Sequence, residues 1–212
     1  MVMKKIFLLV GPTLMIFIGL QLLESVIVAF LLFYSWLLAV PLLGGGVHWE
    51  KFKTSRKDAL LGIGSGLLFL LFIFGGVNWL HIYLLDIDQL RVLLWEWGFS
   101  SRGEVWLVLI LLVVNPVLEE VYWRGYIFEK LRLEGTAKYT IFMTSAFYTL
   151  YHFLSVIPIF SGIFGIVAAI PVFIAGIFWG CIREKTGTIT AAIIGHVLSD
   201  MGIILVYWFL VR

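Results

Sequence analysis

The sequence predicts an all-α, polytopic membrane bundle of about seven transmembrane helices, and three observations carry this prediction. Of the 212 residues, 62% are hydrophobic and only 13% are charged, and the mean hydropathy is +1.06. A soluble domain has about 25% charged residues, so this chain lacks the polar surface that water requires. Its apolar residues also fall into runs of about 20 or more, the length of a membrane-spanning helix.

The first apolar block, 6–43, is too long for one crossing and suits two helices, near 6–22 and 25–44. Two lysines ahead of the block imitate a signal peptide. However, the apolar run continues without a small-residue cleavage site before a soluble region, so we expect retained membrane helices. Three consecutive glycines end the second helix, and a basic loop follows.

The rest of the chain continues the same pattern. A third span, 59–85, precedes an amphipathic, tryptophan-containing connector, 86–104, which we expect to lie at the membrane interface. Four further spans follow: 105–128, 139–157, 162–182 (bent or interrupted by Pro171) and 189–211. The chain is thus one integral membrane domain, 1–212, with generic helices in 1–85 and a motif-bearing core in 105–212.

The loop charges predict an orientation, because loops on the cytoplasmic side are rich in Lys and Arg. With the N-terminus inside, the inner loops hold Lys51, Lys53, Arg56, Lys57, Lys130, Arg132, Lys138, Arg183 and Lys185. The outer connector holds Asp86, Asp88, Glu96 and Glu104 against only Arg91 and Arg102. We therefore expect the N-terminus in the cytoplasm and the C-terminus outside, with the first block forming two helices.

Composition also limits the function classes. A formal charge of +2 and the lack of a basic tail argue against nucleic acid as a partner. Cys181 is the only cysteine, so an intrachain disulfide and an all-cysteine metal site are both excluded. Because Cys181 lies in an apolar run, where a thiolate is costly, we assign it a structural role.

Ionisable residues stand well inside three of the last four helices, where each costs at least about 2.5–3.5 kcal/mol and usually serves a function. On the fourth span, Glu120 and Arg124 are four residues apart and can form an ion pair. Glu119 lies about 100° around the helix, alongside Asn115, and stays available as a general base or acid. The alternative is that both glutamates belong to the interfacial end of the helix.

The fifth and seventh spans carry the other polar groups. On the fifth, Ser145, Tyr148, His152 and Ser155 form a polar stripe at three- and four-residue steps. A lone histidine there is also compatible with a hydrogen-bonded packing residue. On the seventh, His196 and Asp200 share one face, and the carboxylate can orient the imidazole. Gly195 permits close approach of another helix. Together these residues predict one polar site inside the bilayer.

These three motifs resemble the signature of the CAAX-protease and bacteriocin-processing family of intramembrane endopeptidases. The motifs are Glu119-Glu120-x-x-x-Arg124, Tyr148-x-x-x-His152 and His196-x-x-x-Asp200, and the resemblance covers about residues 104–205. It departs from the family at two positions: Tyr148 stands where Phe is usual, and Asp200 where Asn is often found. The second departure matters more, because an ionised Asp cannot donate a hydrogen bond to an oxyanion. Asp200 would therefore stay protonated, orient His196 or act as a ligand.

The resemblance implies a glutamate-dependent hydrolysis without a covalent enzyme intermediate. Glu119 would activate a water, His152 would help to hold it, and His196 with Asp200 behind it would stabilise the tetrahedral oxyanion. Glu120, Arg124 and Tyr148 would be supporting residues. The substrate would be a membrane-associated protein or peptide, with or without a lipid group.

Three alternatives stay open. A zinc peptidase could use His152, His196 and Glu119 as ligands, although the His-Glu-x-x-His motif is absent and we expect no cofactor. A non-catalytic immunity or scaffold protein would keep the motifs without turnover. A proton-coupled transporter also buries ionisable residues, but the chain has no internal repeat and groups them at one site.

Overall fold

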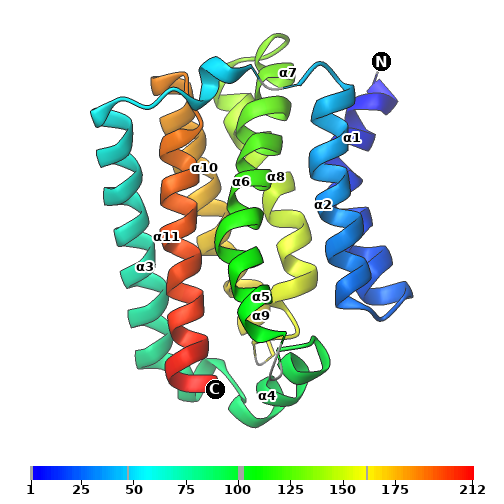
Figure 1. The fold of residues 1–212 in the computed structure, drawn as a ribbon, viewed down its shortest axis with the longest axis vertical. Helices are drawn as coiled ribbons and strands as arrows, with labels where there is room; N and C mark the ends of the chain where they lie inside the picture. The colour runs from blue at the N-terminus through cyan, green and yellow to red at the C-terminus, as the bar shows by residue number, and fades with distance from the viewer. Residues whose placement is uncertain (1, 47, 100–102, 161) are drawn as a thin grey trace.

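A computed structural model describes residues 2–46, 48–99, 103–160 and 162–212, and all the regular elements in these ranges are helices. The long helices run side by side along the long axis of the molecule (Figure 1). The N-terminus lies at one end of the bundle and the C-terminus at the other (Figure 1). The predicted all-α polytopic bundle is therefore confirmed.

The helices that run along the bundle are α1 (Val2–Phe17) with the π-helical η1 (Ile18–Leu22), α2 (Val26–Leu43), α3 (Arg56–Leu84), a composite helix over Glu104–Arg132, α8 (Ala137–Val156), α10 (Ala169–Thr186), and α11 (Thr190–Val206) with η5 (Tyr207–Val211). The composite helix consists of α5 (Glu104–Leu109), η3 (Ile110–Val114), α6 (Asn115–Glu120), η4 (Val121–Ile127) and α7 (Phe128–Arg132). The short elements are η2 (Trp49–Phe52), α4 (Ile87–Glu96) and α9 (Phe164–Val167).

Six of the described helices are long and apolar enough to cross a membrane. The remaining predicted span, α8, has 20 residues, which suffices for a crossing, but it is not among the six. Its polar stripe lowers its hydropathy. The outer faces of the bundle support a lipid environment, because large apolar side chains such as Leu31 and Leu71 are about two-thirds exposed there.

The predicted helix boundaries are largely confirmed. The chain turns between α1 and α2 at Glu24, which has a positive φ of 46°, and Ser25 caps α2 by accepting a hydrogen bond from the Val28 N–H. The sixth span is interrupted as predicted, but at Ala168 rather than at Pro171. Pro171 is the third residue of α10, where the N–H has no partner within the helix and proline is tolerated.

Two helix pairs flank the centre of the bundle: α1 with α2, and α3 with α11 (Figure 1). Glycines allow α3 and α11 to approach closely. A Cβ atom on Gly62 would come within 2.7 Å of the Ala191 carbonyl oxygen, and one on Gly66 within 2.6 Å of the Leu198 Cβ. Such small-residue contacts are typical of membrane helices, which gain no hydrophobic advantage from one another in lipid.

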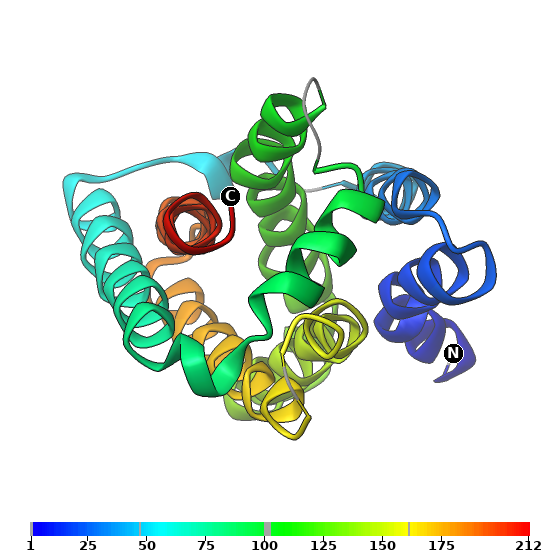
Figure 2. The same ribbon diagram turned by 90° about the horizontal axis from the view of Figure 1, so that it is seen from below.

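The connector forms α4, which crosses the C-terminal end of the bundle (Figure 2). Leu90 faces inward and Trp95 is 67% exposed, as expected of an amphipathic helix; Arg102 lies outside the described residues. At the opposite end, the segments predicted as inner loops lie with the N-terminus (Figure 1). The placement of Arg183 in a loop is wrong: this residue lies inside α10 and is 5% exposed.

Candidate active site

The composite helix changes its winding on both sides of the glutamate pair. The π-helical segments η3 and η4 flank α6, which begins Asn115-Pro116 and ends with Glu120. Proline cannot donate to the carbonyl one turn earlier and its ring crowds it, which accounts for the widened turn of η3. Single π turns are frequent at functional sites. Both glutamates are buried, 2% and 0% exposed.

Glu120 and Arg124 form the predicted ion pair. The Arg124 Nη1 donates to the Glu120 Oε1 at 3.0 Å, and neither side chain is exposed. The guanidinium also donates from Nη2 to the Gly176 carbonyl at 3.3 Å and lies 4.5 Å from the centre of the Tyr148 ring. Each buried charge thus has an opposite charge and further polar contacts, as burial in a membrane core requires.

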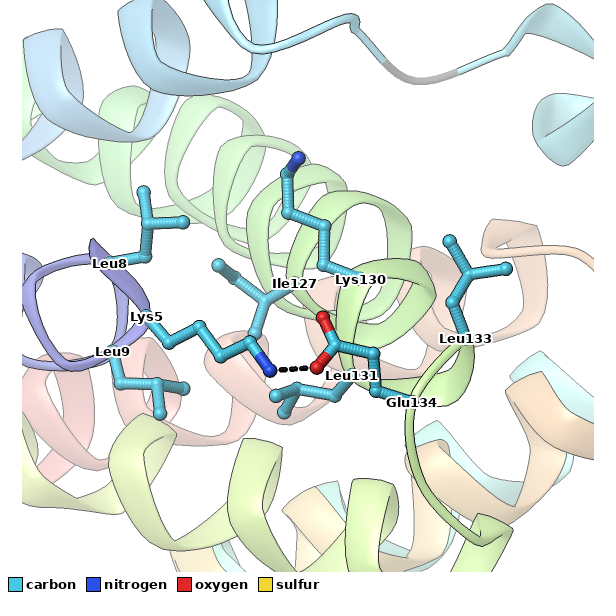
Figure 3. Close-up of a pocket in the computed structure, with 8 residues that line it drawn as sticks. All are labelled: Lys5, Leu8, Leu9, Ile127, Lys130, Leu131, Leu133 and Glu134. Atoms are coloured by element: carbon cyan, nitrogen blue, oxygen red, sulfur yellow. Dashed lines mark hydrogen bonds and ion pairs between the residues drawn. The ribbon is translucent and has the colours of Figure 1, made fainter. Parts of the chain in front are cut away.

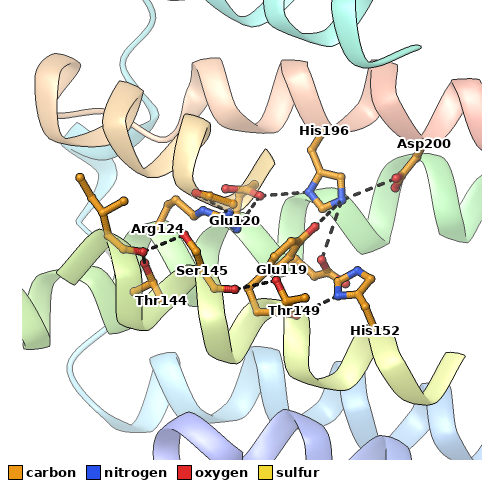
Figure 4. A network of polar contacts seen from close by, with 12 residues as sticks. Glu119, Glu120, Arg124, Thr144, Ser145, Thr149, His152, His196 and Asp200 are labelled. Carbon is orange, nitrogen blue, oxygen red and sulfur yellow. Dashed lines mark hydrogen bonds and ion pairs between the residues drawn. The ribbon is translucent and has the colours of Figure 1, made fainter. Parts of the chain in front are cut away.

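His196 joins the two glutamates (Figure 4). Its Nδ1 lies 3.0 Å from the Glu120 Oε1. Because an ionised carboxylate only accepts hydrogen bonds, Nδ1 carries a proton and donates it. The other ring nitrogen, Nε2, lies 3.8 Å from the Glu119 Oε2 and 3.6 Å from the Asp200 Oδ1.

The position of Asp200 corrects one expectation. Asp200 was expected to stand behind His196 and orient the ring, but it lies on the Nε2 side, together with Glu119. Glu120 makes the orienting contact, at Nδ1. The spacing of four residues did bring His196 and Asp200 together on one face of α11, but spacing alone does not decide which ring nitrogen the carboxylate meets.

The polar stripe of α8 divides into two groups. Ser145 and Ser155 donate to carbonyls of their own helix, those of Ile141 and His152. Tyr148 and His152 reach the site instead. The His152 Nδ1 is 2.8 Å from the Tyr148 carbonyl oxygen, which can only accept, so the neutral ring keeps Nε2 as an acceptor. The Tyr148 hydroxyl lies 3.4 Å from the His196 Nε2.

Asn115 was expected beside Glu119, one turn back. Its Oδ1 accepts a hydrogen bond of 3.3 Å from the hydroxyl of Tyr34 on α2. α2, which was predicted to be a generic membrane helix, therefore contributes a polar contact to α6, the helix that carries the glutamate pair. A single tyrosine in an apolar run gives no sequence signal for this contact.

Two residues at the site were not predicted. Trp179 of α10 stacks on the His196 ring, with centroids 4.9 Å apart and planes 24° apart. Arg183 donates from Nε to the Arg124 carbonyl at 2.8 Å and from Nη2 to Glu129 at 3.1 Å, so it fixes the backbone of η4. One feature of the sequence could have drawn attention to Trp179: it lies between two glycines, at 176 and 180, and one helical turn before Arg183.

Other features lie away from these residues. Among the described residues, no group of three or more His, Cys, Asp or Glu side chains is arranged to hold a metal ion. A pocket of about 260 Å³ lies between α1 and α7, beside the ion pair of Lys5 with Glu134 (Figure 3). Its lining includes none of the motif residues.

The geometry brings three carboxylates, those of Glu119, Glu120 and Asp200, around the imidazole of His196, with Tyr148 and His152 beside them. A family model for type II CAAX prenyl endopeptidase Rce1-like proteins matches residues 101–202, slightly less than half of the chain. No curated protein and no solved structure gives a significant match. The matched segment contains all three motifs and confirms the resemblance read from them: residues 101–202 are similar to type II CAAX prenyl endopeptidases, a family of membrane proteases.

Proposed function

We propose that this membrane protease hydrolyses a peptide bond with a water molecule that Glu119 activates. The observation that carries the proposal is the difference between the adjacent glutamates. Glu120 binds both Arg124 and His196 at 3.0 Å through its Oε1, although its Oε2 has no hydrogen-bond partner in the described part of the chain. The Glu119 Oε2 is buried, lies 3.8 Å from the His196 Nε2, beyond hydrogen-bond distance, and has no other partner among the described residues. A buried carboxylate oxygen without a hydrogen-bond partner is suited to take a proton from a reacting water.

The other residues fit the steps of this reaction. The His152 Nε2 accepts a hydrogen bond from the water and helps to aim it. The water oxygen attacks the peptide carbonyl carbon while Glu119 accepts its proton. His196, as an imidazolium, donates from Nε2 to the oxyanion of the tetrahedral intermediate. Glu119 then returns the proton to the leaving amine as the C–N bond breaks, so no covalent enzyme intermediate forms.

The supporting residues keep His196 in place. Glu120 accepts from Nδ1 and Trp179 stacks on the ring. Asp200, on the Nε2 side, balances the charge of the imidazolium. We propose a peptide or membrane-associated protein, with or without a lipid group, as the substrate. The protein would sit in a prokaryotic cell membrane with its N-terminus in the cytoplasm.

The test is cleavage of quenched fluorescent peptides, lipidated and unlipidated, by detergent-purified protein. Wild type and Glu119→Gln are compared with and without a strong zinc chelator, and Glu50→Gln, which changes an exposed carboxylate, serves as the control. We expect cleavage by wild type and the control, with or without chelator, and none by Glu119→Gln. Near-normal cleavage by Glu119→Gln would refute the proposal. Chelator-sensitive cleavage would replace it with the zinc alternative, in which Glu119, His152 and His196 are ligands.

A further inference from the structure

Tyr148 is the one residue of the α8 stripe whose side-chain hydroxyl crosses to another helix in the described part of the chain. Its hydroxyl oxygen lies 3.4 Å from the His196 Nε2 of α11, and its side chain is buried, with the residue 3% exposed. The two serines of the stripe, Ser145 and Ser155, donate to carbonyls of α8 itself, as do the neighbouring Thr144 and Thr149. The Tyr148 hydroxyl is therefore directed at the site and does not bond to a carbonyl of its own helix.

The surroundings of the His196 Nε2 are rich in acceptors. Glu119 and Asp200 present carboxylate oxygens at 3.8 and 3.6 Å, and ionised carboxylates cannot donate. Nδ1 holds its proton against Glu120. A neutral His196 consequently has a lone pair at Nε2 and cannot donate to an oxyanion from that side. A phenol O–H can donate a hydrogen bond to an oxyanion on the Nε2 side, whatever the protonation state of the imidazole.

We propose that the Tyr148 hydroxyl is a catalytic donor that binds the oxyanion of the tetrahedral intermediate together with the His196 Nε2. The inference rests on the proposed function, because it names a further group for the same hydrolysis. In the free enzyme the phenol lies within reach of Nε2. When the carbonyl oxygen gains negative charge between them, the O–H turns to that oxygen, and the phenol keeps its proton throughout.

The ring of Tyr148 is held independently of the hydroxyl. The Arg124 guanidinium carbon lies 4.5 Å from the centre of the ring, and the ring is nearly perpendicular to that of Trp123, with centroids 6.5 Å apart. Phenylalanine keeps these contacts, so Tyr148→Phe removes the donor and leaves the packing. Loss of one oxyanion donor typically lowers kcat by about 10²–10³-fold.

The experiment compares Tyr148→Phe with Tyr122→Phe. Tyr122 is a matched control because it is also buried and donates its hydroxyl bond, 2.6 Å, to the Leu8 carbonyl on the far side of η4. We expect Tyr148→Phe to lower kcat by about 10²–10³-fold with little change in KM. Tyr122→Phe should leave kcat within a few-fold of wild type, whatever it does to thermal stability.

A second measurement separates a catalytic donor from a packing residue. A phosphinate peptide has a tetrahedral centre with a charged oxygen and imitates the intermediate, whereas an uncleavable N-methyl amide peptide imitates the substrate. Tyr148→Phe should raise the inhibition constant of the phosphinate by about the same factor as it lowers kcat/KM. It should leave the affinity for the amide peptide nearly unchanged.

The results distinguish this inference from the proposed function. If Glu119→Gln is inactive and Tyr148→Phe keeps wild-type kcat, only the role of Tyr148 is wrong. Equal weakening of both peptides by Tyr148→Phe would also overturn it, because that result indicates packing. If Glu119→Gln is active, the hydrolytic mechanism itself fails, and the inference fails with it.

Discussion

The polar network has two halves that differ in how tightly they are bonded (Figure 4). In the paired half, Glu120 and Arg124 are 3.0 Å apart, and the guanidinium also binds the Gly176 carbonyl. In the open half, Glu119 and Asp200 lie 3.8 and 3.6 Å from the His196 Nε2, without hydrogen bonds to it. His196 belongs to both halves, because its two nitrogens face different sides.

The difference shows how one membrane site can be both stable and reactive. Charges buried in a bilayer are tolerated when each has a partner, and the paired half meets this condition. The open half leaves the Glu119 Oε2 without a hydrogen-bond partner within the described ranges, which is unfavourable for folding but keeps this oxygen available to water and substrate. We therefore expect substitutions in the paired half to act mainly on stability and those in the open half mainly on activity.

The largest effect is expected for Arg124→Ala. This change leaves Glu120 buried without its cation, and breaking a buried ion pair in this way costs about 3–5 kcal/mol. The free energy of unfolding, measured in detergent or bicelles, should fall by that amount. Glu120→Gln with Arg124→Met, which removes both charges, should recover most of the loss. Unchanged stability of Arg124→Ala would show that the paired half does not hold the fold.

A smaller effect is expected for His152→Ala in the open half. Without the acceptor that aims the water, kcat should fall by about 10²-fold or more. The free energy of unfolding should change by only about 1 kcal/mol, the value of the hydrogen bond to the Tyr148 carbonyl. Ser155→Ala is the control on the same stripe, since its hydroxyl bonds only to its own helix. If His152→Ala unfolded the protein instead of lowering its turnover, the distinction between a paired half that acts on stability and an open half that acts on activity would be wrong.

The smallest effect is expected where α11 meets its neighbours. A Cβ atom on Gly195 would come within 2.7 Å of the Trp179 Nε1 and 2.9 Å of the Ser65 Oγ. Gly195→Ala should therefore cost about 1–3 kcal/mol of stability. It should also lower kcat, because Trp179 stacks on His196. Gly64→Ala on α3, which has no atom within 4 Å of its added Cβ, should be neutral or slightly stabilising.

Much of the fold followed from the sequence because a bilayer imposes simple rules. The lengths of the apolar runs predicted where the helices lie. The spacing of four residues predicted the contacts of Glu120 with Arg124 and of His196 with Asp200. Patterns on one helix say little about contacts between helices. The orienting role of Glu120 at His196, the stacking of Trp179 and the burial of Arg183 all depend on how α6, α10 and α11 pack.

The most direct measurement compares Glu119→Gln with Glu120→Gln, two isosteric changes at adjacent residues, by kcat and by free energy of unfolding in the same detergent. We predict that Glu119→Gln abolishes cleavage, at least a 10²-fold loss in kcat, with stability unchanged or raised. Glu120→Gln should lower stability, by about 3 kcal/mol or more, because it leaves Arg124 buried without its anion. The reverse result, an active Glu119→Gln or a fully stable Glu120→Gln, would contradict the division of this site into an open half that reacts and a paired half that supports it.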